Sequence, residues 1–299
     1  MARDAQLARP LIFGEVLFDC FEDGTEVLGG APFNVAWHLA GFGLDPLFVS
    51  RVGRDPQGAA VRQRMADWGL RTEGLQLDDR HPTGRVEIRM LADGGHRFEI
   101  LADQAYDHID PAPVTALLER LPADLLYHGS LAVRAPASAA ALAALRARGL
   151  PRFVDINLRA PWWQPEPVRE LMAGARWLKL NDEELDLLQP GEAGPGARAR
   201  ALREANGHDW LILTRGAAGA TLYTADGEFS GTPPWVEVVD TVGAGDAFAA
   251  VCLLGLIEGW PAARTLERAL AFAARICGQR GATAPDRALY ASLRERWQS

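Results

Sequence analysis

The chain has 299 residues, of which 48% are hydrophobic and 23% are charged, and its formal net charge is -8. This composition is ordinary for a soluble globular protein, and the length allows one large α/β domain or two modest ones. The acidic balance argues against a nucleic-acid partner, because no basic surplus neutralises a run of phosphates, and it leaves room only for a local pocket that takes one small phosphate ligand.

The cysteines and the apolar runs indicate the cellular compartment of the protein. Cys20, Cys252 and Cys277 are odd in number and widely spaced, which fits neither a disulfide framework nor a Cys-x-x-Cys metal site and favours a reducing compartment. Residues 1–10 carry charges without an apolar core, unlike a signal peptide. The apolar run of residues 247–257 is too short to span a bilayer. We therefore expect a cytoplasmic protein with no membrane partner.

The N-terminal part predicts a strand followed by a glycine turn. Residues 11–19 form an apolar run that ends at Asp19. Ligands of open α/β sheets lie beyond the carboxyl ends of strands, so Asp19 is a candidate for binding hydroxyls, although a plain turn aspartate fits as well. The pair Gly29–Gly30 precedes a predicted helix that contains Asn34. Glycines allow close approach of a ligand, and an amide both donates and accepts, which suits a polyol; a flexible turn before a capped helix is the alternative.

The next segments alternate between strand and helix. Residues 47–53 and 125–131 are apolar runs typical of buried strands, and residues 59–68 and 136–148 have helical character. This alternation predicts a parallel sheet with crossover helices.

A different pattern lies between these units. Residues 85–91 and 96–101 nearly alternate between apolar and polar side chains, and the Ala-Asp-Gly-Gly sequence at 92–95 joins them, which predicts a hairpin. A hairpin inserted into an α/β chain is a candidate lid, together with residues 20–27, and lids exclude water from reactive phosphate. A decorative antiparallel edge is the alternative.

The C-terminal half carries polar groups at the ends of predicted strands. Asp155, Asn157 and Arg159 lie at alternating positions of a predicted strand over residues 152–159, so an extended segment points them to one side. Asn181 and Glu184 follow another predicted strand with the spacing of a capping box, and their oxygens also suit a hydrated Mg²⁺.

Two glycine turns follow. Thr214 and Gly216 lie in a turn between two predicted strands and are candidates for nucleotide contacts. Residues 236–239 then predict a short strand that leads to Gly243, Gly245 and an apolar helix with Asp246 in its first turn. Free N–H groups at a helix start bind anions, and the nearby acid suggests phosphoryl transfer. No Gly-Lys-Ser/Thr follows, so this is not a Walker A loop, and it also lacks the third glycine of a dinucleotide fingerprint.

The longer string Asp-Thr-Val-Gly-Ala-Gly-Asp-Ala-Phe at 240–248 resembles the C-terminal signature of the ribokinase-like (PfkB) carbohydrate kinases. Residues 29–36 are similar to the N-terminal signature of the same family, residues 179–184 to its Asn-x-x-Glu element, and residues 214–219 to its Thr-x-Gly-x-x-Gly loop. These matches come in family order and extend over nearly the whole chain. Softer similarities point to bacterial fructokinases, with Ile156 in place of the usual Pro and Val242 in place of the commoner Thr or Ser as departures; these segments are residues 14–19, 102–107, 129–132 and 155–159.

The resemblance implies a ribokinase-like three-layer α/β/α fold with a mainly parallel central sheet and a small inserted β-sheet lid. It implies a single kinase domain over residues 1–299, with lid strands at approximately 16–28 and 84–102. The exposed edges of such strands leave backbone groups unpaired, and pairing with a second chain would cover them. We therefore expect a homodimer through the lid.

The resemblance also implies site residues. Asp246 is expected to be the catalytic base, with the backbone of Gly243, Ala244 and Gly245 as an anion hole. Mg²⁺ is expected through water at Glu184, and K⁺ near Asp240 and Val242. The sugar-binding residues implied are Asp19, Gly29, Gly30, Asn34, Phe98, Asn157 and Arg159. The nucleotide-binding residues implied are Lys179, Asn181, Thr214, Gly216, Gly219, Gly245 and Cys277.

The resemblance implies an ATP-dependent sugar kinase that phosphorylates a primary hydroxyl, with fructose giving fructose 6-phosphate. A 2-keto-3-deoxygluconate kinase, or another PfkB sugar or nucleoside kinase, is the alternative within the family. A catalytically silent sugar-binding regulator is the alternative outside enzymes, because a fold does not fix a function.

Overall fold

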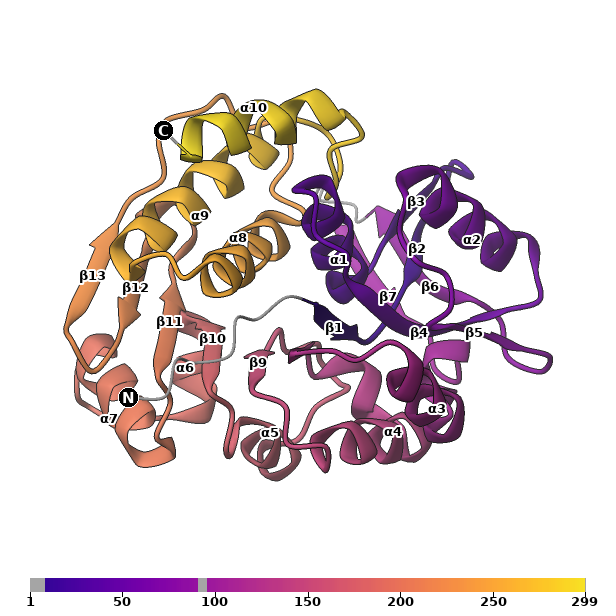
Figure 1. The fold of residues 1–299 in the computed structure, drawn as a ribbon, viewed down its shortest axis with the longest axis horizontal. Helices are drawn as coiled ribbons and strands as arrows, with labels where there is room; N and C mark the ends of the chain where they lie inside the picture. The colour runs from indigo at the N-terminus through magenta and orange to yellow at the C-terminus, as the bar shows by residue number, and fades with distance from the viewer. Residues whose placement is uncertain (1–8, 91–95, 299) are drawn as a thin grey trace. The chain divides into compact units, whose positions relative to one another are not determined.

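In this computed structural model, which describes residues 9–90 and 96–298, the chain folds into two compact units (Figure 1). The first unit contains Ala123–Leu131 and Leu150–Ala284, and the second contains Leu11–Pro122 and Ala132–Gly149 together with α10 (Arg287–Gln298). Each unit is therefore assembled from segments that are distant in the sequence. Within the described residues, no helix has the length and apolar character needed to cross a membrane.

The first unit contains a six-stranded stretch of sheet in the order β13-β12-β11-β10-β9-β8. The strands from β8 to β11 run parallel, whereas β12 and β13 run antiparallel. The connections explain the change, because α5 (Pro165–Met172) leads from β9 to β10, and α6 (Asp182–Leu188) and α7 (Pro195–Asn206) lead to β11, whereas a short turn joins β11 to β12. The strands are β8 (Leu125–His128), β9 (Arg152–Asp155), β10 (Trp177–Asn181), β11 (Trp210–Thr214), β12 (Ala220–Tyr223) and β13 (Glu228–Gly231).

Helices cover both faces of this sheet, as the three-layer prediction requires. Leu178 and Leu180 of β10 pack into one core with residues of α5, α6 and α7. Successive side chains of a strand alternate between faces, so Lys179 points to the other face, where it lies beside the start of α8 (Ala244–Glu258). Figure 1 shows α8 beside α9 (Ala262–Cys277), and α9 packs on β12 and β13.

The second unit contains three further parallel strands in the order β1-β4-β5, so the two units together contribute nine strands of mainly parallel sheet among the described residues. Its core includes Trp37 and Trp68, whose rings stack with centroids 4.3 Å apart. The strands are β1 (Pro10–Phe13), β4 (Leu47–Gly53) and β5 (Leu75–Asp78); the helices are α1 (Ala31–Gly41), α2 (Pro56–Trp68), α3 (Pro111–Arg120), α4 (Pro136–Arg146) and the short 3-10 turn η1 (Ala105–His108).

A separate four-stranded sheet in the second unit has the order β3-β2-β6-β7. It consists of β3 (Glu26–Gly29), β2 (Leu17–Phe21), β6 (Gly84–Met90) and β7 (His96–Ile100). The antiparallel pairing of β6 with β7 confirms the predicted hairpin, although the tip predicted at 92–95 lies outside the described residues. The small sheet is confirmed as well, while its role as a lid and the single-domain assignment stay predictions.

Several predicted strands were wrong in extent. The strand predicted at residues 125–131 ends at His128. The run at residues 11–19 is interrupted after Phe13, because the chain bends at Gly14, where a side chain would overlap Pro32, and Asp19 therefore lies inside β2 rather than at a strand end. The strand predicted at residues 152–159 ends at Asp155, because Asn157 takes a left-handed backbone conformation with φ 46°.

The strand predicted at residues 236–239 is also absent from the described part of the chain. Val238 and Val239 are exposed, and the Val239 N–H donates to the Cys277 carbonyl at 2.8 Å. The β-branched residues predicted a strand, but this segment is fixed by the end of α9 and not by a ladder of hydrogen bonds.

Candidate active site

The glycine turn at Gly243 starts α8 in a shape that suits an anion. Gly243 has φ 78° and is the N-cap of α8, and a Cβ there would lie 2.5 Å from the Ala282 Cα. Only glycine fits this position, because the turn is left-handed and packs against another loop. The first N–H groups of a helix make no intrahelical bond, so the turn presents donors and a positive dipole end to a ligand. Asp246 lies in this first turn.

A buried cation lies beneath this turn. A Cβ on Gly245 would lie 3.6 Å from the Lys179 Nζ, so the ammonium is close to the backbone of the turn. Lys179 is 7% exposed, and its Nζ lies 2.8 Å from both carboxylate oxygens of Asp155. Burial alone would lower the pKa of Lys179, but the Asp155 carboxylate outweighs it, with smaller contributions from other acids that include Asp246, and the pKa lies above its usual value. Lys179 therefore stays charged next to the start of α8.

Asn181 and Glu184 form the predicted capping box at the start of α6. The Asn181 Oδ1 accepts from the Glu184 N–H at 2.8 Å, and the Glu184 Oε2 accepts from the Asn181 N–H at 2.9 Å. The second oxygen, Glu184 Oε1, accepts from the Leu158 N–H at 2.7 Å. Burial raises the pKa of the Glu184 carboxyl. Each carboxylate oxygen thus has one backbone donor and retains capacity for one more, which a water molecule can fill.

The two strands that lead to the candidate nucleotide-binding residues, β10 and β11, end at the same level of the sheet. Asn181 and Thr214 are register partners on the parallel strands β10 and β11. The turn after β11 requires glycines, because Gly216 has φ 51° and a Cβ on Gly219 would overlap the Gly231 carbonyl. This brings Asn181, Thr214 and Gly216 to the carboxyl edge of the sheet, where ligands of open α/β sheets bind.

Asp240 connects the loop before α8 to the loop after α9. Its Oδ1 accepts from the Val242 N–H at 3.0 Å, and its Oδ2 accepts from the Gly281 N–H at 3.0 Å. The carbonyl of Cys277 accepts from the N–H groups of Val239 and Asp240. Asp240 thereby holds these two loops close together. Main-chain carbonyl oxygens in such loops are the type of ligand that a monovalent cation requires.

The structure does not group Asn157 and Arg159 with Asp155 in the expected way. Because the strand ends before them, the alternation that predicted a common side no longer applies. Arg159 is exposed, and its Nη1 donates to the carbonyl of its neighbour Leu158.

Four of the predicted sugar-binding residues gather within the second unit. The Asp19 Oδ2 would lie 3.8 Å from a Cβ on Gly29, so this carboxylate lies beside the glycine pair. Gly30 has φ 108°, and a Cβ there would lie 2.7 Å from the Glu15 carbonyl. Gly30 caps α1, and Asn34, which is 3% exposed, lies one turn further along that helix. A carboxylate, an amide and a bare backbone therefore form one polar group suited to hydroxyls.

Phe98 lies on the same face of the small sheet as Asp19. Asp19 pairs with Val86, Val86 pairs with Ile100, and Phe98 is two residues from Ile100 on β7. Paired residues and residues two apart share a face. The Phe98 side chain is 60% exposed.

The partnership of Lys179 with Asp155 was not predicted from the sequence. Both residues interrupt apolar strands, which was the available signal, because a charge inside a buried strand requires an opposite charge nearby. The register pairs Lys179 with Asp155 on neighbouring strands β10 and β9. What was not visible from spacing alone is that these two strands are adjacent.

Comparison with known proteins identifies the family. A model of the pfkB family of carbohydrate kinases matches residues 13–289. A fructokinase from Klebsiella pneumoniae is 33% identical over 265 residues, which cover 82% of this chain and 83% of that protein. An aminoimidazole riboside kinase from Salmonella typhimurium is 33% identical over 238 residues, covering 76% and 73%. A double-mutant fructokinase from Vibrio cholerae O395, solved with fructose, ADP and a potassium ion, has a TM-score of 0.80 at 23% identity over 97% of this chain and 99% of that one.

Proposed function

Because the chain belongs to the pfkB family of carbohydrate kinases, which are ATP-dependent phosphotransferases, we propose that it phosphorylates a primary hydroxyl of a small sugar, with fructose as acceptor and fructose 6-phosphate as product. One observation carries this proposal. The Gly243 turn starts α8 with Asp246 in its first turn and the charged Lys179 beneath Gly245. An anion-binding turn, an acid and a fixed cation are the parts that phosphoryl transfer needs.

In the proposed reaction, Asp246 accepts the proton of the sugar hydroxyl as that oxygen attacks the γ-phosphorus of ATP. The hydroxyl has to come within hydrogen-bond reach of the carboxylate. Backbone N–H groups of Gly243, Ala244 and Gly245 stabilise the charge that moves onto the phosphoryl oxygens. Lys179 adds a positive charge that costs no reorganisation, because Asp155 already holds the ammonium in place.

The residues fit the two cations of the family in different ways. Glu184 retains one acceptor position on each oxygen, which suits a water of hydrated Mg²⁺ better than direct ligation. When bound, Mg²⁺ neutralises phosphate charge. K⁺ suits the loops that Asp240 holds together, with the carbonyls of Asp240 and Val242 as ligands. Lys179, Asn181, Thr214, Gly216, Gly219, Gly245 and Cys277 are the residues proposed to contact the nucleotide.

The acceptor is proposed to bind at Asp19, Gly29, Gly30 and Asn34. None of these four residues carries a positive charge, so the group favours a neutral polyol over an acidic sugar. Arg159 is the residue that would favour an acidic sugar such as 2-keto-3-deoxygluconate if its side chain turned from the Leu158 carbonyl to the substrate. Because the chain is similar to a riboside kinase, nucleosides are further candidate acceptors. The ring of Phe98 would then be the aromatic surface on which the base stacks.

The test of catalysis is Asp246→Asn, measured by ADP release with saturating ATP and fructose. We expect turnover to fall by about 10²–10⁴-fold, the range for loss of a positioned base, with binding of ATP and fructose by calorimetry largely retained. Asp226→Asn, in the exposed turn between β12 and β13, is the matched control and should keep full activity. Near-normal turnover of the Asp246→Asn protein would remove Asp246 from the role of base.

The test of specificity compares ADP release with fructose, ribose, 2-keto-3-deoxygluconate, tagatose 6-phosphate and adenosine. A higher kcat/KM for fructose than for the others supports the proposed acceptor. A higher value for 2-keto-3-deoxygluconate or for adenosine replaces it by the corresponding family alternative. Binding of a sugar without ADP release from any of them favours the sugar-binding regulator.

We further propose that the strands at 16–28 and 84–102 serve as the lid of a single kinase domain and pair two chains in a homodimer. The exposed Phe98 on the face that carries Asp19 supports a covering role for this sheet. Phe98→Ser is expected to weaken dimerisation in sedimentation experiments or to raise the KM for the sugar; a change in neither quantity speaks against both roles.

A further inference from the structure

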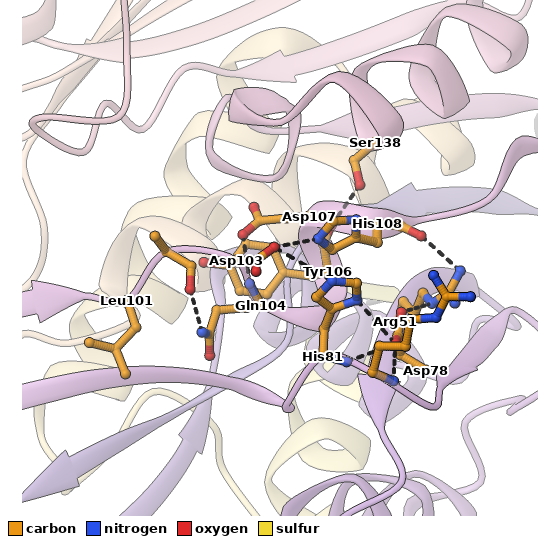
Figure 2. Close-up of polar contacts among 12 residues, drawn as sticks. Arg51, Asp78, His81, Leu101, Asp103, Gln104, Tyr106, Asp107, His108 and Ser138 are labelled. Atoms are coloured by element: carbon orange, nitrogen blue, oxygen red, sulfur yellow. Dashed lines mark hydrogen bonds and ion pairs between the residues drawn. The ribbon is translucent and has the colours of Figure 1, made fainter.

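Two histidines and an aspartate meet at the two ends of the β6–β7 hairpin, and none of the three is among the site residues proposed above. His81 precedes β6, whereas Asp103 and His108 follow β7. The His108 Nε2 lies 2.8 Å from the Asp103 Oδ1, and the His81 Nε2 lies 3.6 Å from the same oxygen (Figure 2). One ligand atom from each of the three residues lies within 4.8 Å of the others. Three metal-type ligand atoms therefore lie close to one another.

A buried carboxylate orients His81. Asp78 is 2% exposed, and its Oδ1 accepts from the N–H groups of Arg80 at 2.7 Å and of His81 at 2.8 Å. The His81 Nδ1 lies 3.1 Å from the same Oδ1. An Nδ1–H that donates to a carboxylate leaves the lone pair on Nε2, which is the nitrogen that faces Asp103. Metal-binding histidines typically have such a carboxylate partner on the other ring nitrogen.

The segment that carries His108 is held by the same network. Arg51 pairs with the Asp78 Oδ2 at 2.6 Å, and its Nη1 donates to the His108 carbonyl at 2.9 Å. The Ser138 Oγ donates to the Tyr106 carbonyl at 2.7 Å, which fixes η1 from α4. In Figure 2, Arg51 and Asp78 lie to the right of the two imidazoles and Ser138 lies above them. The two histidine backbones are thus positioned before any ligand arrives.

The cluster is open to solvent on one side. His81 and His108 line a cavity of about 490 Å³ together with Arg51 and Asp78. Their side chains are 23% and 31% exposed, and the Asp103 side chain is 71% exposed. An ion can therefore enter with its waters. The two rings now stack with centroids 3.6 Å apart, so their nitrogens converge on one ion only after the rings turn apart; both rings line the cavity.

We propose that His81, Asp103 and His108 bind one divalent transition-metal ion of the Zn²⁺ class, with water in the remaining position. Imidazole nitrogen and carboxylate oxygen are the usual ligands of Zn²⁺, whereas Mg²⁺ prefers oxygen alone. The bound ion would join the chain before β6 to the chain after β7. The site would therefore clamp the base of the hairpin, and its existence does not depend on the proposed kinase reaction.

The experiment uses the full chain without an affinity tag, treated with a chelator and then titrated with Zn²⁺ by calorimetry and with Co²⁺ by visible absorption. We expect one ion per chain. His81→Gln and His108→Gln should each weaken Zn²⁺ binding by more than about 100-fold, beyond the 10–100-fold that loss of an orienting partner costs. Asp79→Asn removes a nearby exposed charge outside the cluster and should leave the affinity unchanged.

Zn²⁺ should also raise the melting temperature of the chain and not that of either variant, because an ion that binds the folded state stabilises it. Circular dichroism in chelator checks that each variant is folded, and Asp103→Asn, which changes an exposed side chain, replaces a variant that fails this check. Absence of stoichiometric Zn²⁺ binding by the unmodified chain would overturn the proposal. Equal affinity in the unmodified chain and in both histidine variants would overturn it as well.

Discussion

The buried pair of Lys179 and Asp155 should stabilise the first unit only while both charges are present. Their side chains are 9% and 3% exposed, and the ammonium lies 2.8 Å from both carboxylate oxygens. Removal of one partner leaves a buried charge without compensation, which costs about 3–5 kcal/mol. We therefore expect Lys179→Met and Asp155→Asn each to lower the free energy of unfolding by that amount.

The double variant separates pairing from packing. In Lys179→Met with Asp155→Asn neither charge of the pair remains, so most of the single-variant loss should disappear, and the coupling between the two sites should be several kcal/mol. Urea unfolding followed by circular dichroism measures all four proteins of this cycle. Asp209→Asn, which breaks an exposed pair with Arg176, is the control and should cost less than about 1 kcal/mol.

Two results would refute the reasoning. One is a cost below about 1 kcal/mol for both single variants, the level of an exposed ion pair. The other is a double variant whose loss equals the sum of the single losses, because an additive result means that the two charges do not compensate each other. ATP binding gives a second readout, since Lys179→Met also removes the cation beneath Gly245 and should weaken nucleotide binding.

Burial holds the pKa of His208 below its usual value of 6.5, although its Nδ1 lies 2.7 Å from the Ala175 carbonyl. Between pH 6.5 and the lower pKa of the folded state, only the unfolded state binds this proton, so the free energy of unfolding should fall as the pH decreases through that window. Urea titrations at several pH values should show a smaller pH dependence of the free energy of unfolding for His208→Gln than for the unmodified chain. An equal pH dependence of the two proteins would contradict the assignment. Gly243→Ala should lower the melting temperature and the turnover, because φ is 78° and the new Cβ meets Ala282. Gly259→Ala at the end of α8, with φ 68° and open space around it, measures the backbone cost alone, about 1 kcal/mol, and an equal effect of both substitutions would rule out the packing argument.

Local patterns predicted most of the elements because their causes are local. The Asp-Gly-Gly sequence and the alternation around it predicted the hairpin of β6 and β7, and the Asn181 spacing predicted the capping box; the structure confirms the strand pairing and the capping box. The family signatures gave the ribokinase-like fold class. One error, at residues 236–239, occurred where a long-range contact overrides a local preference, because the Cys277 carbonyl holds this segment in an irregular conformation.

The sequence by itself determined the chemistry available to this protein: a glycine turn at the start of an apolar helix, an acid in its first turn and a glycine pair before Asn34. The tertiary structure alone decided which charges meet. Lys179 and Asp155 are 24 positions apart and become partners because β9 and β10 are neighbours. His81 and His108 approach each other because the hairpin between them returns the chain to its base. Electrostatic interaction depends on distance in space and on burial, and the order of residues along the chain specifies neither.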